Sequence, residues 1–385
     1  MIIVAIYANN HTMYIPRILE LSDSLKKKSL FLFGPRQTGK SSLIRHTLPK
    51  AKVFNLLDQA TFLKLSVSPT FIRETLTPKD KSVVIDEIQK LPQLLDEVQL
   101  LIEEKGVHFL LTGSSSRALK RRGINLLGGR ARSRFLHPFI FNELKDFDLI
   151  QALNRGLIPS IYFSDSPQED LKAYCGDYLQ NEILAEGLTR NPPAFSRFLE
   201  VAAMSQGKLI NFTEIANDSQ VKLTTVREYF QILQDTLIAV EVPAFLKTKN
   251  RKAIQTSKFY FFDVGVAGSL ATRGIISGKS PLFGEAFETY LFHELCAFKD
   301  YTKKESLQFW RSASGFEVDF ILDEHIAIEV KGKSIITEKD LRGLKALREE
   351  KLMKKYFLVS LEKDIRKVDG IECYPWDRFL QMLWS

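Results

Sequence analysis

The chain has 385 residues, of which 26% are charged and 45% hydrophobic, and its formal net charge is +8 at pH 7. This length allows two or three domains. The proportions of charged and hydrophobic residues exclude a disordered or fibrous chain. No apolar run approaches the roughly 18 residues of a membrane span, and the apolar start is too short for a secretory signal. The modest basic excess favours a polyanionic partner. The cysteines lack metal-ligand spacing and predict reduced thiols in a cytoplasmic protein: Cys175, Cys296 and Cys373.

A phosphate-loop pattern is the strongest signal near the start of the chain. Residues 14–28 predict a helix, with Ile15, Ile18 and Leu19 on its apolar side. Residues 30–33 are an apolar run with the length of a buried strand. The pattern G-x-x-x-x-G-K-S follows directly, and a helical pattern begins after it. In such a loop, backbone N–H groups and the helix N-terminus face phosphate oxygens.

This loop predicts a site for ATP and Mg²⁺. We expect Lys40 to reach the β- and γ-phosphates and the Ser41 hydroxyl to bind Mg²⁺. A glycine-containing surface turn before a basic helix is the alternative, which the strand before and the helix after the loop disfavour. The predicted nucleotide-binding residues are Gly34, Pro35, Arg36, Gln37, Thr38, Gly39, Lys40, Ser41 and Ser42.

Two carboxylates end a later buried strand. Residues 51–58 predict a second strand, and residues 81–87 predict a third that closes with Asp86 and Glu87. Ligands of a parallel sheet gather beyond the carboxyl ends of its strands. We therefore expect Asp86 in the Mg²⁺ shell and Glu87 beside the attacking water, which it would orient and deprotonate. A capping role before a helix at 88–104 is the alternative, and a complete phosphate loop disfavours it.

A fourth strand, at 107–112, is followed by Ser114, whose hydroxyl could contact the γ-phosphate or the attacking water. Capping of the next helix explains this serine equally well. Seven basic residues then fall within 117–134, and a solvated surface is their default interpretation. The sharper one is an arginine supplied to the ATP of a neighbouring subunit in a homo-oligomer. Our first candidate is Arg130, followed by Arg132 and Arg134.

These motifs occur in the order found in one family. The chain resembles the prokaryotic AAA-plus ATPases that carry a C-terminal domain of unknown function, and the likeness covers nearly all of it. The resemblance implies an α/β AAA-plus core that uses ATP and Mg²⁺, with the Ser114 region as its polar sensor. The stretches that carry it are Gly34–Ser41, Asp86-Glu87, Leu111–Ser115, Gly129-Arg130, Pro138–Glu143, Gly156–Pro159 and Phe259–Gly265.

The middle of the chain predicts a lid and a winged helix. Residues 168–190 predict a charged amphipathic helix over the nucleotide, ended by Asn-Pro-Pro at 191–193. Residues 195–263 then follow a helix, turn, helix, hairpin order, which is typical of a winged helix. We expect it to bind DNA, with internal packing as the alternative. The candidates are Thr224, Thr225, Arg227 and Glu228 on the second helix and Lys247, Lys249, Arg251 and Lys252 at the hairpin tip.

A third unit follows a Gly- and Ser-containing connector. It begins with a helix from Gly284 and continues with strands at 307–312, 317–322 and 326–331. If a three-residue turn joins the last two strands, Asp319 lies opposite Glu329. Two opposed carboxylates repel each other, and a bound divalent cation removes that repulsion. Strict alternation would place Val318, Phe320 and Leu322 together on the other face.

An acid, then Glu-x-Lys, and a glutamate on the preceding helix are similar to the PD-(D/E)xK nuclease fold. This resemblance implies that Asp319 and Glu329 hold Mg²⁺ or Mn²⁺, that Lys331 positions water and that Glu288 supports the metal. Such folds often persist without catalysis, so an inactive domain that binds DNA or a partner is the alternative. Without a metal, we expect Lys331 to pair with Glu317.

The sequence thus predicts Mg-dependent ATP hydrolysis coupled to the binding or processing of DNA. The rival interpretation is a nucleotide-gated interaction protein with an inactive nuclease-like domain. The predicted units are an AAA-plus P-loop core at 1–165, a helical lid at 166–194, a winged helix at 195–265, a linker at 266–283 and a restriction-nuclease-like α/β domain at 284–385.

Overall fold

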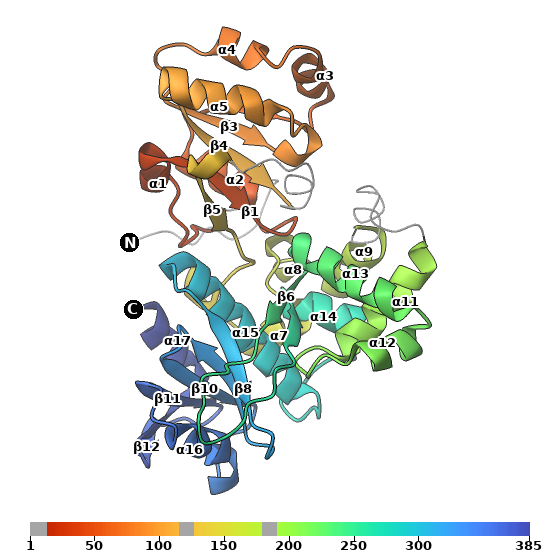
Figure 1. Cartoon of the computed structure of the whole chain (residues 1–385), viewed down its shortest axis with the longest axis vertical. Coiled ribbons are helices and arrows are strands. Elements are labelled where there is room, and N and C mark those ends of the chain that lie inside the picture. The colour runs from red at the N-terminus through yellow and green to blue at the C-terminus, as the bar shows by residue number, and fades with distance from the viewer. Residues whose placement is uncertain (1–13, 115–126, 179–190) are drawn as a thin grey trace.

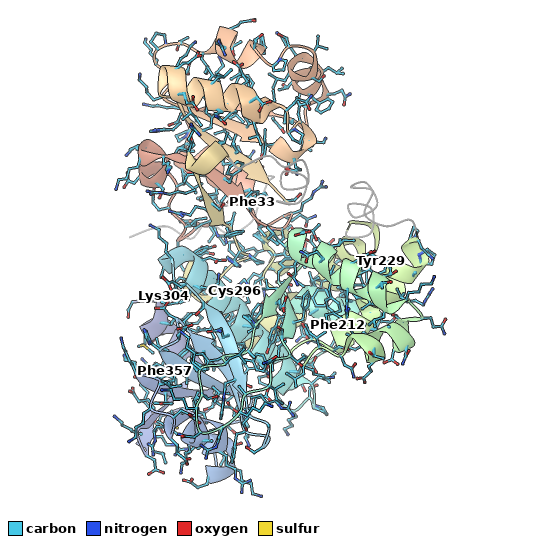
Figure 2. All side chains as sticks on the ribbon, viewed as in Figure 1. Phe33, Phe212, Tyr229, Cys296, Lys304 and Phe357 are labelled. Atoms are coloured by element: carbon cyan, nitrogen blue, oxygen red, sulfur yellow. The ribbon has the colours of Figure 1, made fainter. Side chains whose placement is uncertain are left out.

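The computed structural model describes residues 14–114, 127–178 and 191–385, which form three units in chain order (Figure 1). The first unit lies at the top of Figure 1, the helices of the second at the right and the third at the lower left. Three buried aromatic residues labelled in Figure 2 lie one in each unit: Phe33, Tyr229 and Phe357.

The first unit is a five-stranded parallel sheet with the strand order β2-β3-β4-β1-β5. Alternate residues of β1 face opposite sides: Leu30 packs with α1 and α2, whereas Phe31 packs with α3, α4 and α5. The elements are α1 (Ser22–Lys27), β1 (Ser29–Phe33), α2 (Lys40–Thr47), β2 (Lys52–Asn55), α3 (Gln59–Val67), α4 (Phe71–Thr75), β3 (Ser82–Asp86), η1 (Ile88–Lys90), α5 (Leu94–Lys105), β4 (His108–Gly113), η2 (Leu127–Gly129) and β5 (Ala131–Phe135).

Two predicted helices of this unit were wrong in extent. The helix expected at 14–28 begins only at Ser22, because the preceding residues form a strap held by hydrogen bonds to Glu143 instead of helical ones. The helix expected at 88–104 is a short 3-10 turn followed by α5, and Pro92 separates the two. The parallel strands around the phosphate loop were predicted correctly.

The second unit is mainly helical and buries its own core. The order of its helices and strands agrees with the sequence, and β6 and β7 form an antiparallel pair. Its elements are η3 (Phe141–Glu143), α7 (Leu149–Arg155), α8 (Pro159–Tyr162), α9 (Pro167–Ala173), η4 (Tyr174–Tyr178), α11 (Pro192–Met204), α12 (Phe212–Ser219), α13 (Leu223–Asp235), β6 (Ala239–Val242), β7 (Lys258–Phe261) and α14 (Val264–Leu270).

Helices begin at two of the boundaries predicted in this unit. Asn-Pro-Pro starts α11, because the Asn191 side chain accepts the Ala194 N–H and prolines suit the first turn. Within the predicted linker, α14 is a helix with a buried apolar side that packs between α7 and α15. The rest of the predicted lid helix, 179–190, lies outside the described residues, as do the basic positions 117–122.

The third unit is a six-stranded mixed sheet with the order β12-β13-β11-β10-β9-β8. The long helix α15 covers one face and α16 the other. Its elements are α15 (Phe283–Thr302), β8 (Leu307–Arg311), β9 (Glu317–Leu322), β10 (Ile326–Lys331), η5 (Glu338–Leu341), α16 (Arg342–Arg348), β11 (Lys355–Ser360), β12 (Arg366–Val368), β13 (Ile371–Pro375) and α17 (Trp376–Trp384).

The connection between β6 and β7, residues 243–257, crosses from the second unit onto the third. Ala244 bridges to Phe309 of β8 and Ala253 to Ser312 just after it, and the Phe245 side chain is buried in the core beside α16. Three successive backbone N–H groups, at 249–251, donate to the Glu350 carboxylate at 2.8 to 2.9 Å. This segment, named here the clasp, covers the edge strand of the third sheet.

Candidate functional site

The phosphate loop lies where the sequence predicts it, between β1 and α2. Gly34 and Gly39 are required there: a Cβ on Gly34 would lie 2.4 Å from the Leu136 carbonyl oxygen, and Gly39 has φ +94°. The buried Lys40 ammonium donates to the carbonyls of Gly34 at 2.7 Å and Pro35 at 3.0 Å. These bonds hold the lysine within the loop, beside the place where phosphates are expected.

Asp86 connects the carboxyl end of β3 to the start of α2. Its carboxylate accepts a hydrogen bond of 3.1 Å from the Ser41 hydroxyl and another from the Thr112 hydroxyl. Thr112 also accepts the Glu87 N–H at 3.0 Å. The sequence analysis missed Thr112, although its place at the end of the strand next to β3 could have indicated it. Ser41 and Asp86 together offer hard oxygen ligands that fit Mg²⁺.

Glu87 and Ser114 are brought together by a glutamine that the sequence analysis missed. The Gln89 amide donates to the Glu87 carboxylate and, at 3.2 Å, to the Ser114 hydroxyl. Glu87 has φ +62°, an uncommon conformation for a residue without a glycine's freedom. Strain of this kind is common at functional sites. The neighbouring serines at 115 and 116 lie outside the described residues.

A cavity of about 870 Å³ opens above the phosphate loop. Its walls come from the loop and α2, from the strap at 14–17 and from α8 of the second unit. Tyr14 stacks on His46 with ring centroids 3.6 Å apart, and both rings line the cavity. Sequence reasoning missed this pair because it placed residue 14 in a helix. The size and the mixture of rings and polar groups suit a nucleotide.

The second unit contacts the phosphate loop directly. The Ser160 hydroxyl of α8 donates to the Gln37 side chain at 2.8 Å, and the Tyr174 hydroxyl lies 3.5 Å from the Arg36 carbonyl oxygen. Two stretches that carry the family resemblance, 156–159 and 259–265, meet behind α8. There the Asp263 carboxylate accepts the Leu157 N–H at 2.6 Å. A Cβ on Gly156 would lie 2.0 Å from the same carboxylate, so this close approach requires glycine.

Arg130 lies far from the phosphate loop of its own chain. It precedes β5, whose first residue pairs with Ser29 at the start of β1, so it sits at the opposite edge of the sheet. Its guanidinium forms a 2.8 Å ion pair with Glu103, and both side chains are about two-fifths exposed. The reserve candidates Arg132 and Arg134 lie in β5 itself, an edge strand. None of the three lines the cavity above the phosphate loop.

The predicted nuclease residues meet in a cluster of charged groups, named here the carboxylate cluster. Lys331 lies 2.5 Å from Glu329 and 3.9 Å from Asp319. A second lysine, Lys258 of β7, lies 2.6 Å from Glu317 and 3.7 Å from Glu288. The sequence analysis missed Lys258, which comes from another unit and carries no motif. Two lysines therefore lie among four carboxyl groups, each within 3.9 Å of two of them.

Burial shifts the protonation of the carboxylate cluster. Burial, followed by the charge of Asp319, raises the pKa of Glu288 to about 7 and the pKa of Glu329 well above its ordinary value. Burial opposes the charge of Lys258, but the three nearest carboxylates prevail and raise its pKa to about 12. The Tyr260 hydroxyl donates to Glu288 at 2.6 Å. The cluster is thus held by two lysines and by the hydrogen bond from the Tyr260 hydroxyl.

The predicted register of β9 and β10 was right, and two details of it were wrong. Leu322 pairs with Ile326 as expected, but β9 contains a bulge opposite Phe309. Val318 therefore faces the α16 side, while Phe320 and Leu322 face α15. The Asp319 carboxylate accepts the Val330 N–H at 2.8 Å, in place of a ladder bond. Glu317 pairs with Lys258 and Arg311 instead of Lys331.

The predicted DNA-binding residues fall into two sets. On α13, Thr224 and Arg227 are solvent-facing, and Arg227 lies over the Phe212 ring. At the hairpin tip, Lys247 pairs with Glu324 and Arg251 with Glu349, both in the third unit. At Lys247 and Arg251 the structure favours the alternative of internal packing, because the clasp lies against the third unit.

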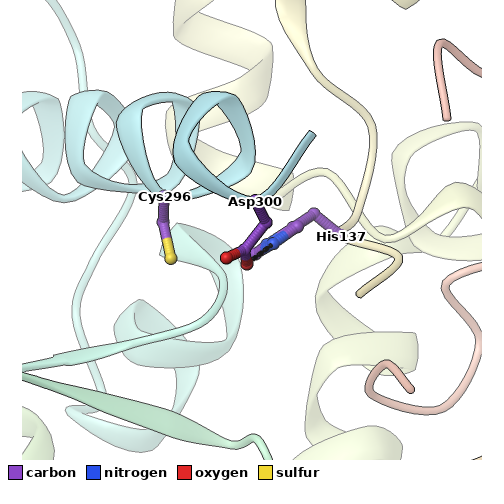
Figure 3. Close-up of side chains that lie close together, drawn as sticks. All are labelled: His137, Cys296 and Asp300. Carbon is purple, nitrogen blue, oxygen red and sulfur yellow. Dashed lines mark hydrogen bonds and ion pairs between the residues drawn. The ribbon is translucent and has the colours of Figure 1, made fainter. Parts of the chain in front are cut away.

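Another group of possible metal ligands lies between the first and third units (Figure 3). Asp300 and Cys296 are one turn apart on α15, and His137 follows β5. The His137 Nε2 lies 2.7 Å from Asp300, which also pairs with Lys299. Burial raises the pKa of the Cys296 thiol to about 12. The carboxylate already has two partners, His137 and Lys299, so this group joins the two units through polar contacts.

Within 14–114, 127–178 and 191–385, no other three residues bring His, Cys, Asp or Glu ligand atoms within 4.8 Å of one another. The oxygens of Glu288, Asp319 and Glu329 are therefore too dispersed for a closed metal site as they stand.

All three cysteines are free thiols. In the same ranges, no helix combines the length and the hydropathy needed to cross a bilayer.

Family models match three successive parts of the chain. Residues 26–145 match an AAA domain, residues 146–275 a domain of unknown function (DUF8612) and residues 283–379 a second domain of unknown function (DUF4143). Uncharacterized proteins of Mycobacterium tuberculosis and Mycobacterium bovis are each 22% identical over 305 residues, which cover 76% of this chain and 67% of theirs.

Among solved structures, the chain is similar to a Signal Transduction ATPase with Numerous Domains (STAND) protein with a tetratricopeptide repeat sensor from Pyrococcus horikoshii. The identity is 13% and the TM-score 0.21, over 75% of this chain. The chain spans 48% of that structure's length, and this TM-score is too low to indicate a common fold. The AAA domain match, together with the parallel sheet and the phosphate loop, makes the first unit a P-loop ATPase domain of the AAA type.

Proposed function

We propose that the protein hydrolyses Mg-ATP in the cavity above the phosphate loop. The observation that carries this proposal is the continuous network at the ends of β3 and β4, which joins Ser41 to Asp86 and Glu87 to Ser114. Both halves border the loop that holds Lys40. Phosphoryl transfer depends on positioning and on electrostatic stabilisation, and this network supplies groups for both.

Each residue has a distinct role in this proposal. Lys40 exchanges its two carbonyl partners for phosphate oxygens. Ser41 and Asp86 hold Mg²⁺, which neutralises charge on the phosphates when bound. Glu87 orients the attacking water and takes its proton, and Gln89 fixes the direction of the Glu87 carboxylate. The Ser114 hydroxyl contacts the γ-phosphate at the other end of the network.

We propose further that turnover needs a neighbouring subunit. Arg130 sits at the sheet edge opposite its own phosphate loop, so its guanidinium is available to another copy of the chain once it leaves Glu103. A guanidinium supplied in trans stabilises the charge of the transferring phosphoryl group. The functional form would then be a homo-oligomer.

For the third unit, we favour the inactive alternative over the nuclease. Lys258 and Lys331 already neutralise the acids that would hold a metal, and Lys258 is 2% exposed. The coupling to DNA rests on the exposed side of α13, because two of the four tip cations pair with the third unit. The rival role, a nucleotide-gated interaction, draws support from the contacts of Ser160 and Tyr174 with the phosphate loop.

Two variants test the hydrolysis proposal. Lys40→Ala should abolish ATP binding in a calorimetric titration, because it removes the only lysine of the phosphate loop. Glu87→Gln should bind ATP like the parent and turn over roughly 10²- to 10⁴-fold more slowly, because it removes the base alone. Equal turnover by parent and Glu87→Gln would show that Glu87 has another role.

The same preparation distinguishes the DNA proposal from its rival. DNA that binds through α13 should stimulate ATP hydrolysis, and its affinity should fall steeply with salt because phosphate contacts release counterions. Arg227→Ala should reduce the stimulation, and Lys79→Ala, at an exposed cation of the first unit, serves as the control. Turnover that ignores DNA at every salt concentration would favour the nucleotide-gated interaction.

A further inference from the structure

Arg17 is buried between the phosphate loop and the segment that follows β5. Its side chain is 3% exposed and lies in the strap before α1. The guanidinium donates to the Thr38 carbonyl at 2.7 Å, to the carbonyls of His137 and Pro138 at 2.7 and 3.0 Å, and to the Glu143 carboxylate at 2.8 Å. The four acceptors are three backbone carbonyls and one buried carboxylate, so the folded chain fixes their positions.

The bond to Thr38 determines the direction of a peptide group in the phosphate loop. A planar trans peptide points its C=O and N–H in opposite directions. When Arg17 draws the Thr38 oxygen to the outer side, the N–H of Gly39 must face the other way, toward the inside of the loop. N–H groups that face inward are what an anion-binding loop needs.

Glu143 fixes Arg17 in this position. Its carboxylate is fully buried as a side chain and also accepts the N–H groups of Ile18 and Ile140 at 2.8 and 3.2 Å. Burial raises the pKa of Glu143, against the opposing effect of Arg17. A buried pair of this kind is no more stabilising than well-packed apolar residues. Its geometry therefore matters more than its contribution to the free energy of unfolding.

We propose that Arg17, held by Glu143, is a positioning residue that keeps the phosphate loop in its phosphate-receiving conformation. Without it, the peptide between Thr38 and Gly39 is free to turn, and the loop must be ordered by the nucleotide at the cost of affinity. This inference rests on the proposed binding of Mg-ATP and adds a residue outside the phosphate-loop motif. Lysine cannot replace Arg17, because one ammonium cannot form the planar fork that reaches three carbonyls and a carboxylate.

The test compares two paired substitutions in the full-length protein. Arg17→Met with Glu143→Met removes both charges at once, so neither ion is left buried alone. Arg73→Met with Glu97→Met removes another ion pair of the same unit, with Nε and Oε1 2.9 Å apart, away from the phosphate loop. Dissociation constants for Mg-ADP and for Mg-ATP are measured by calorimetry, and the melting temperature of each variant is measured without nucleotide.

The Arg17 pair should bind Mg-ADP roughly tenfold to a hundredfold more weakly than the parent, the range expected for hydrogen bonds to a charged group. It should melt close to the parent, and the Arg73 pair should bind like the parent. Arg17→Lys should bind as weakly as the Arg17 pair. If the parent binds tightly and the folded Arg17 pair binds equally well, this inference is wrong while the proposed function stands. A parent that binds no nucleotide would overturn both.

Discussion

The phosphate site and the carboxylate cluster differ in how their charges are satisfied. At the phosphate loop, Lys40 bonds to neutral backbone carbonyls beside a cavity of about 870 Å³. In the carboxylate cluster, Lys258 and Lys331 bond to carboxyl groups of the same chain. A cation held by neutral dipoles can exchange them for a phosphate, whereas one held by buried carboxylates would leave an unpaired charge behind.

In our proposal, this difference separates a site that receives a ligand from one whose charged groups have their partners within the chain. Both sites contain the residues of a recognisable motif, and both were found from sequence. Only the contacts around the motif distinguish them. A motif establishes which groups are present, and the partners of those groups establish whether they are available.

The largest effect is expected on ATP turnover at the phosphate loop. It comes from a residue that lies outside the cavity of its own subunit. Arg130→Ala should leave the affinity for ATP nearly unchanged and lower turnover by roughly 10³- to 10⁵-fold, if it acts on the neighbouring subunit's ATP. Glu103→Ala, which only frees Arg130 from its ion pair, is the matched control and should not lower turnover. Concentration-independent turnover by a protein that remains monomeric in sedimentation would contradict this prediction.

The second prediction concerns the closed site. Lys258→Met should lower the free energy of unfolding by about 3–5 kcal/mol, because Glu317 and Glu288 lose a buried cation. Mn²⁺ should then raise the melting temperature of this variant more than that of the parent, since hard oxygen ligands become free. The full-length chain is required, because the clasp belongs to the core of the third unit. An equal gain in the parent would identify a working metal site and contradict the inactive domain.

The third prediction uses the raised pKa of Glu288. The folded protein keeps this proton up to about pH 7, whereas the unfolded chain loses it near the ordinary value of 4.5. Folded stability should therefore fall as the pH rises from about 4.5 to 7, by up to about 3 kcal/mol, and stay level above that. Glu288→Gln should reduce this dependence in urea titrations at several pH values, and the remaining slope belongs to Glu329, whose pKa is raised as well. A slope as steep in the variant as in the parent would assign the proton to another group.

The smallest effect is expected at the surface of the clasp. Lys247→Ala removes an exposed ion pair with Glu324 and should change the free energy of unfolding by less than about 1 kcal/mol. Phe245→Ala, two residues away, empties a buried position and should cost about 3–5 kcal/mol. The contrast would show that the clasp is held by its apolar contact and its backbone bonds. Similar losses from both variants would place the stabilisation in the ion pair instead.

Most of the first unit could be predicted because its signals are local. The run at 30–33, the phosphate loop and Asp86-Glu87 each lie within a few consecutive residues, and a parallel sheet brings their ends together. Gln89 and Thr112 could not be assigned, because an amide and a hydroxyl are common everywhere and gain meaning only from their partners.

The contacts between units could not be predicted. Lys258 enters the carboxylate cluster from a strand of another unit, and Arg17 joins residues more than a hundred positions apart. The bulge at Asp319 depends on the pairing of β9 with β8, which alternation of residue types does not reveal. Each of these features is set by tertiary packing and leaves no periodic trace in the sequence.

The clasp has a consequence for how such a chain can evolve. One family model ends at residue 275 and the next begins at residue 283, so the boundary between them follows the clasp in the chain. A recombination event at that boundary would separate β8 from the segment that covers its edge and would remove Phe245 from the core beside α16. Lys258 would be lost from the carboxylate cluster at the same time. The clasp and the third unit therefore have to be inherited together, although they match two different family models.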